Sequence, residues 1–285
     1  MAAGEPSRWL IPLKNPIAFQ HGIRFSLRME KHVILSAVAS FALAVDVSGQ
    51  YATGFEAPTF TAGQTINTQD GWTSTTPDRA RVLTDAQIST ELTTMSITPG
   101  QTTHSGSQAL FVSGTGGSSA TIRAIAGLET QNEVALDFWA RPLTSANIGN
   151  TFITMEDAAG DRAAAIRFGP TGIDYGTQIT TGLWTPSGTT WNADTWYRLT
   201  LEVNYATDTY DFLIDGAQVN AEPIPFYSSA SDSFNQIRIF RGSNQAGAII
   251  DDVGVAAVPE PGTWALLAIG GGAFLLRRRA KRNAL

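Results

Sequence analysis

The segment Trp196-Tyr197-Arg198-Leu199-Thr200-Leu201-Glu202-Val203-Asn204-Tyr205 alternates between apolar and polar side chains. The odd positions from Tyr197 onward would share one face, and the even positions from Arg198 to Asn204 the other. A period of two residues predicts a half-buried β-strand. Tyr210–Ile214 alternates in the same way and ends at Asp215-Gly216, a pair typical of tight hairpin turns. Together the two segments predict an antiparallel hairpin.

Further segments share this period. Val134 to Ala140 places Val134, Leu136, Phe138 and Ala140 opposite Asp137, Trp139 and Arg141. Four more segments predict strands: Phe152–Glu156, Arg162–Phe168, Gln236–Phe240 and Ala248–Val255. The stretch 59–107, rich in Thr, Ser, Gly and Gln, is interpreted as long loops with one or two strands. Since no long segment has a helical period, the pattern predicts an all-β fold, an antiparallel two-sheet sandwich.

The end of the chain has a different composition. Val258-Pro259-Glu260-Pro261 is followed by the apolar residues 262–276, then by a basic tail, residues 277–285, that begins with Arg277, Arg278 and Arg279. The prolines favour an extended, accessible backbone at 258–261. The apolar run predicts a short single transmembrane helix, which the arginines would stop on the cytoplasmic side. A buried C-terminal core helix is the alternative interpretation.

A second apolar run lies near the start of the chain. Met29-Glu30-Lys31-His32 precedes the apolar residues 33–45, and small residues follow up to Gly49. This order predicts a signal peptide at 29–49 for export through the Sec translocon. Residues 1–28 have no apolar periodicity and are interpreted as an extension produced by a mis-assigned start at Met1. The alternative is a long n-region that uses Arg24, Arg28 and Lys31.

Between the two signals, residues 50–257 are predicted to form one β-sandwich domain. They contain nine Arg, no Lys and 21 Asp or Glu, a net charge of −12, against −6 for the whole chain. Such a surface repels phosphate backbones, which argues against nucleic acid as a partner. The chain has no cysteine, so neither disulfides nor thiolate metal sites contribute.

The proline motif, apolar run and terminal arginines together resemble the PEP-CTERM sorting signal of Gram-negative bacteria. The resemblance implies that an exosortase-type processing protease recognises the tail. It also implies export, an intermediate anchored in the inner membrane by the C-terminal helix, and a final place on the cell surface or in the extracellular matrix.

Trp196 to Val203, followed by Phe212 to Gly216, resembles the central hairpin of concanavalin A-like jelly rolls of the laminin-G type. Carbohydrate-binding members of this group often carry a structural calcium ion that joins the first strand to the last. The resemblance implies such a site at Glu56 with Asp251 or Asp252. Calcium takes oxygen ligands, which these carboxylates supply. Alternatively, the three acids cap strands or face water.

The residues do not predict an enzyme. The carboxylate spacing of laminarinase-like jelly rolls, Glu-x-Asp-x-(x)-Glu, is absent from the sequence. His104 is the single histidine of residues 50–257 and is interpreted as a solvated loop residue.

Sugar binding uses aromatic side chains that stack on the sugar ring. Trp184 and Trp191 flank a turn-rich stretch and Tyr175 precedes them, so these three are the candidate ligand-binding residues; alternatively, the tryptophans pin a loop. Trp139 and Trp196 are interpreted as packing or sheet-covering residues. The sequence thus predicts a non-enzymatic, glycan-associating or adhesive protein of the envelope or exopolysaccharide matrix. The alternatives are a structural protein without a ligand and, less favoured, a polysaccharide hydrolase or lyase.

Overall fold

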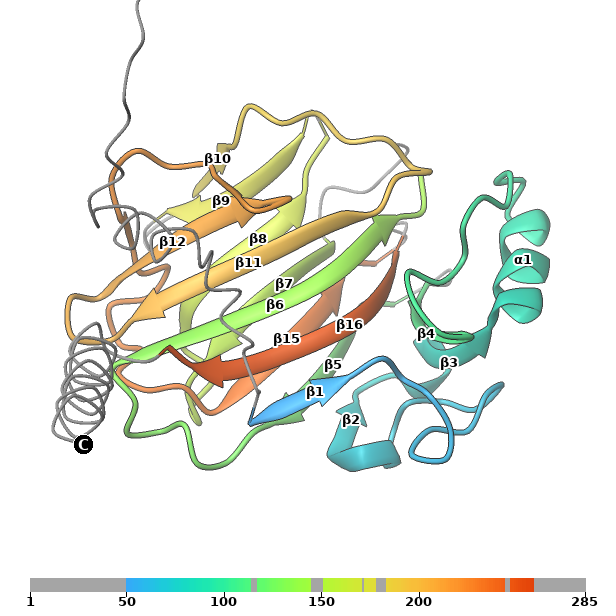
Figure 1. The fold of residues 1–285 in the computed structure, drawn as a ribbon, viewed down its shortest axis with the longest axis horizontal. Helices are drawn as coiled ribbons and strands as arrows, with labels where there is room; N and C mark the ends of the chain where they lie inside the picture. Colours follow the sequence, from blue (N-terminus) through green and yellow to red (C-terminus); the bar gives the residue numbers. More distant parts are fainter. Residues whose placement is uncertain are drawn as a thin grey trace, which may run out of the picture. The chain divides into compact units, whose positions relative to one another are not determined.

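Two antiparallel sheets form most of the computed structural model (Figure 1), which describes residues 50–113, 117–144, 151–170, 172–177, 183–243 and 247–258. Sheet A contains β1 (Tyr51–Thr53), β3 (Ala80–Thr84), β4 (Gln108–Val112), β6 (Glu133–Pro142), β11 (Tyr197–Asn204), β12 (Thr209–Ile214), β13 (Ala217–Gln218), β14 (Ile224–Pro225) and β16 (Ala248–Ala257). Sheet B contains β2 (Trp72–Ser74), β5 (Ser119–Ala124), β7 (Thr151–Glu156), β8 (Arg162–Phe168), β9 (Ile173–Thr177), β10 (Leu183–Pro186) and β15 (Gln236–Arg241). The predicted two-sheet sandwich is confirmed.

The strand order brings segments together that are distant in sequence. Sheet A runs β13-β12-β11-β6-β16-β4-β3, with β1 paired to β16 and β14 to β12, and sheet B runs β10-β9-β8-β7-β15-β5-β2. The predicted hairpin is β11–β12, in which Leu201 lies opposite Phe212. On its other side β11 pairs with β6, where Leu201 lies opposite Leu136. The apolar positions of neighbouring strands are therefore in register on one face.

The main core lies between the two sheets. Sheet A contributes the alternating residues of β6 and β11, such as Phe138 and Leu199, and sheet B contributes Ile153, Ile166 and Ile239. All of these are buried. Burying apolar side chains from both inner faces is the main stabilising contribution to a fold of this kind.

The region 59–107 differs from the prediction because it contains an α-helix, α1 (Asp85–Thr94), and two 3-10 turns, η1 (Gln69–Gly71) and η2 (Pro77–Arg79). The Thr84 side chain accepts a hydrogen bond from Gln87 N, and the Gln87 side chain accepts one from Thr84 N. This reciprocal capping box satisfies two amides at the start of the helix. Ile88 and Leu92, one turn apart, pack with Phe111 in a second cluster on the outer face of sheet A.

The two ends of the domain lie side by side. β1 runs antiparallel to β16, with Tyr51 opposite Val255, and the Val258 amide donates to the Glu133 carbonyl at 3.0 Å. The predicted extension, signal peptide, apolar helix, basic tail and Pro259 to Pro261 all lie outside the described residues. No helix within the described ranges is long and apolar enough to cross a membrane.

Candidate functional site

Aromatic and arginine side chains gather on the outer face of sheet B. In β7, Ile153 and Met155 belong to the core, so Phe152, Thr154 and Glu156 project from the opposite side. The same alternation places residues of β8, β10 and β15 there. We call this surface the aromatic–arginine face; it consists of Phe152, Arg162, Arg167, Trp184, Tyr227, Arg238 and Phe240.

The aromatic rings of this face form a continuous chain of contacts. Phe152 stacks on Phe240 with ring centroids 4.5 Å apart, and on its other side it lies 6.0 Å from Trp184. Trp184 in turn lies 6.0 Å from Tyr227. All four side chains are partly exposed and stand outside the main core. They therefore offer a connected apolar surface to solvent.

The arginines lie over these rings. The Arg162 guanidinium carbon is 5.1 Å from the Phe152 centroid and 5.6 Å from that of Tyr227, and Arg167 lies 4.6 Å above Trp184. These are cation–π distances. Beneath them, Glu156 accepts from Arg162 Nε at 3.3 Å and from Arg238 Nε at 2.9 Å. The surface therefore presents guanidinium groups together with partly exposed rings that these groups partly cover.

Tyr227 reaches the aromatic–arginine face from the loop after β14. Its amide donates to the Ala163 carbonyl at 2.9 Å, which pins the loop to the start of β8. The ring packs directly on Gly176 of β9, where a Cβ atom would overlap with ring carbons. Gly176 therefore makes room for Tyr227 on the sheet.

The three residues predicted to bind ligand are not brought together on one surface. Trp184 lies on the aromatic–arginine face. Trp191 donates from Nε1 to the Gly169 carbonyl at 2.8 Å and packs on Phe168. Tyr175 packs on Phe212 against the core. Sequence reasoning missed Tyr227, Phe152 and Phe240, because their shared surface arises from pairing between strands.

The three acids predicted to bind calcium all contact the loop 104–108. Glu56 accepts hydrogen bonds from the Ser107 and Gln108 amides at 2.7 and 2.8 Å. Asp251 accepts from the amides of His104 and Ser105 at 3.0 and 3.1 Å. The neighbouring Asp252 accepts from the Ser105 hydroxyl at 2.6 Å. These contacts join the beginning of the domain, this loop and the last strand.

Asp251 is the most perturbed carboxylate of this cluster. Burial raises the pKa of Asp251 to about 7, and the nearby Asp252 charge acts in the same direction. The available ligands are oxygens, which suit calcium by chemical type. Within the part of the chain that the structure describes, however, no three His, Cys, Asp or Glu side chains are grouped as a ready metal cluster. An ion here would also need backbone or hydroxyl oxygens.

His104 is held more firmly than predicted. Its Nδ1 lies 2.7 Å from Asp252 Oδ2, and its ring stacks on Trp139 with centroids 3.7 Å apart. Trp196 approaches the histidine edge-on, and its Nε1 donates to the Gln101 carbonyl at 3.0 Å. The interpretation of His104 as a solvated loop residue was therefore wrong, because the loop folds back onto sheet A.

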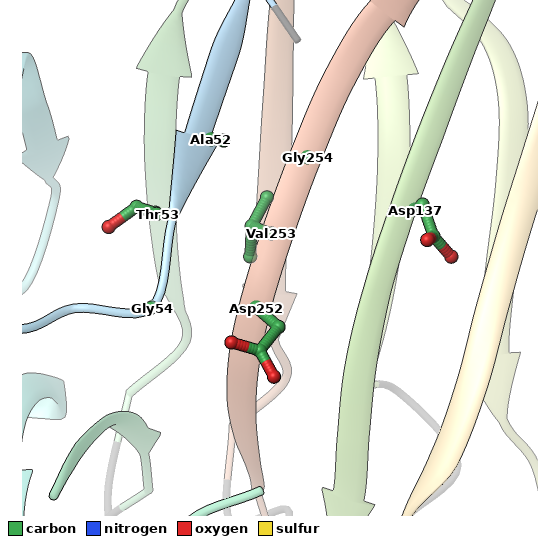
Figure 2. Close-up of a pocket in the computed structure, with 7 residues that line it drawn as sticks. All are labelled: Ala52, Thr53, Gly54, Asp137, Asp252, Val253 and Gly254. Atoms are coloured by element: carbon green, nitrogen blue, oxygen red, sulfur yellow. The ribbon is translucent and has the colours of Figure 1, made fainter. Parts of the chain in front are cut away.

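A trough of ≈ 360 Å³ lies beside this cluster on the outer face of sheet A. Figure 2 shows its lining: β1 on one side, Asp252 to Gly254 of β16 in the middle, and Asp137 of β6 on the other side. The register of β16 against β6 shifts between Asp251 and Gly254, which opens the surface here. Both carboxylates are engaged, Asp252 with His104 and Asp137 with Arg198 at 2.7 Å.

Comparison with solved structures finds similar two-sheet sandwiches at low sequence identity. The cellulose-induced protein Cip1 has a TM-score of 0.52 and 15% identity, covering 73% of this chain and 97% of that one. A carbohydrate esterase from the Shiga toxin-encoding bacteriophage phi24B has a TM-score of 0.49 and 13% identity, covering 73% and 97%. A sialidase has a TM-score of 0.49 and 13% identity; the match covers 68% of this chain but only 18% of the sialidase. No curated protein matches the chain.

The end of the chain matches a family model more specifically. Residues 257–279 match the PEP-CTERM protein-sorting motif, as the resemblance predicted. This motif indicates that the protein is exported and passes through a membrane-anchored sorting intermediate processed by an exosortase-type system.

Proposed function

We propose that this exported protein is a non-enzymatic, glycan-associating module that binds polysaccharide through the aromatic–arginine face. The observation that carries the proposal is the unbroken ring contact from Phe240 through Phe152 and Trp184 to Tyr227. Flat aromatic side chains that are partly exposed on a rigid sheet suit the apolar faces of sugar rings. A sorted surface or matrix protein would encounter polysaccharide where the tail delivers it.

Several observations support a binding role over catalysis. The carboxylate of Glu156 is covered by two arginines, and His104 is engaged by Asp252. Among the described residues, the Ser105 hydroxyl beside His104 is itself hydrogen-bonded to Asp252, and Glu156 is enclosed by its arginines, whereas hydrolysis of a glycosidic bond requires two accessible carboxyl groups.

The finer architecture that we propose is a concanavalin A-like jelly roll followed by a membrane-anchoring helix.

The test is retention of the full chain, solubilised in a nonionic detergent, on a panel of immobilised neutral and acidic polysaccharides. We expect Trp184→Ala and Tyr227→Ala each to weaken binding by about 10-fold, which corresponds to a loss of about 1.4 kcal/mol of binding free energy per ring. Trp139→Ala, on the outer face of sheet A, is the matched control and should bind as the wild type does. If Trp139→Ala alone lost binding, the binding site would lie on sheet A and not on the aromatic–arginine face. Release of soluble sugar from the panel would instead identify an enzyme.

We also propose that calcium binds at Glu56, Asp251 and Asp252 as a structural ion. The buried Asp251 carboxylate supports this, because a cation would stabilise a charge that burial disfavours. When bound, calcium would supply a rigid link between the first and last strands and the loop 104–108.

A thermal melt of the full chain tests the calcium proposal. Excess calcium at about 100 times its Kd should stabilise the fold by about 2.7 kcal/mol, and EDTA should reverse the shift. In Asp251→Asn the shift should vanish. Asp211→Asn, which changes a partly exposed acid on β12 away from the three candidate ligands, should retain it. Melting curves that ignore both calcium and EDTA would refute the proposal.

A further inference from the structure

The charges of the aromatic–arginine face are arranged in two levels. Glu156 is fully buried, while the side chains of its partners Arg162 and Arg238 remain 28% and 25% exposed. The side chain of Asp174 is also nearly buried, at 4% exposed, whereas its partner Arg167 is 19% exposed. The carboxylates of Glu156 and Asp174 therefore lie beneath the guanidinium groups. The guanidinium groups reach solvent beside the aromatic rings, together with the partly exposed acid Asp161 next to Arg162 and Tyr227.

The buried carboxylate also holds the two arginines in a defined orientation. Arg162 and Arg238 each donate to Glu156 through Nε, the guanidinium nitrogen nearest the backbone. The terminal amino groups lie farther along each side chain. Gln236 donates to the same carboxylate at 2.9 Å and Thr154 donates to it at 2.8 Å, so Glu156 is anchored from several sides. Guanidinium groups fixed in this way are prepared to pair with oxyanions.

The arginines of this face contrast with the negative net charge of the domain. Residues 50–257 carry a net charge of −12, and three of their nine arginines lie on this one face. The acidic remainder of the domain repels polyanions, as it repels nucleic acid, so a polyanion that binds would contact this face, where guanidinium groups are exposed.

We infer that the aromatic–arginine face binds an anionic polysaccharide, whose carboxylate or sulfate oxygens pair with Arg162 and Arg238 while its sugar rings stack on Trp184 and Tyr227. The inference rests on the proposed glycan-binding function and names the class of glycan. Glu156 acts as a positioning residue: it orients the two guanidinium groups and does not contact the ligand.

The experiment measures binding of the full chain in detergent to three immobilised polymers: polygalacturonate for carboxylates, dextran sulfate for sulfates and dextran as the neutral arm. The double variant Arg162→Gln/Arg238→Gln should lose about 10-fold or more in affinity for the preferred polyanion. Arg81→Gln removes an arginine of similar exposure, on β3, that pairs with Glu91 of α1, and it should stay within about 2-fold of wild type. Raising NaCl from about 0.05 to about 0.5 M should weaken wild-type binding strongly.

A second variant guards against misfolding, because removing both arginines leaves buried Glu156 without its cations. Arg162→Lys/Arg238→Lys keeps the charge but loses the planar fork, so it should fold and bind at an intermediate level. Stronger binding to one of the two polyanions identifies the oxyanion and supports the inference. Binding of dextran alone, unchanged in the arginine variants, would overturn the inference and leave the proposed function standing. No retention on any polymer, including the wider panel, would overturn both. If Arg81→Gln lost as much affinity for the polyanion as the double variant, the net charge of the protein would explain the effect, and the inference would be overturned.

Discussion

Single residues in this protein take their roles from partners far away in sequence. Trp184 and Trp191 are similar in sequence context, yet one lies under Arg167 on a sheet surface and the other donates to the Gly169 carbonyl. His104 looked like an exposed loop residue, yet it stacks on Trp139 of β6. In each case the residue type was visible in the sequence, but its neighbour was set by the tertiary fold.

Glu202 provides a residue-scale prediction on pH. Burial raises the pKa of Glu202, and the charges of Asp211, Glu133 and Asp137 raise it further. A carboxyl whose folded-state pKa is raised stabilises the fold below its unfolded pKa, and this stabilisation is lost as pH rises through the folded pKa. Glu202→Gln should therefore be more stable than wild type at neutral pH, and the difference should shrink as pH falls through the range in which carboxylates become protonated. Thermal melts across this range, in EDTA, provide the measurement.

The control for this prediction is Glu222→Gln, which removes one negative charge outside this group of acids. It should show a smaller pH-dependent difference from wild type. A Glu202→Gln variant that is less stable than wild type at neutral pH would contradict the stated cause.

At the scale of elements, strands with strong alternation were predictable and the helix was not. β6, β11 and β12 match their predicted segments within one or two residues at each end. Their period of two is a direct consequence of one face being buried between sheets. α1 buries only Ile88 and Leu92 and is rich in Thr and Ser, so its period is weak. The sequence feature that could have indicated this helix is the capping-box spacing of Thr84 and Gln87, just before Ile88.

The cap of α1 is a test of this account. Thr84→Ala removes the hydroxyl that accepts from Gln87 N and should destabilise the protein by about 1 kcal/mol. Thr90→Ala, within the same helix and exposed, removes a hydroxyl that donates to the Ala86 carbonyl and should change stability little. Chemical denaturation of the two variants measures the difference. Equal stabilities for both would mean that packing alone holds the helix.

At the scale of the whole molecule, the sorting signal begins where the last strand of the sandwich ends. β16 ends at Ala257, and the Val258 amide is still bonded to Glu133. The sorting motif itself begins at residue 257. The last core strand and the start of the sorting signal are therefore contiguous.

Deleting residues 259–285 should separate sorting from folding. Because the truncated chain keeps Val258 and every residue of β16, we expect its sandwich to melt as that of the full chain does. It should leave the membrane fraction and accumulate as soluble exported protein, seen by cell fractionation and immunoblotting. Trp184→Ala, with the tail intact, should fractionate as wild type. Retention of the truncated chain at the membrane would assign anchoring to another segment.

The sequence alone determined the fold class and the sorting signal. It also showed that Glu56, Asp251 and Asp252 lie near the two ends of the domain. These features are local: a period of two residues, an ordered series of proline motif, apolar run and arginines, and acids close to the first and last strands. Only the tertiary structure decided which side chains share a surface. Phe152, Trp184, Tyr227 and Phe240 come from β7, β10, a loop and β15, and they meet because strand order places them on one face of sheet B. The physical reason is that alternation sets the face on which a side chain lies, whereas the pairing of strands, a long-range property, sets its neighbours.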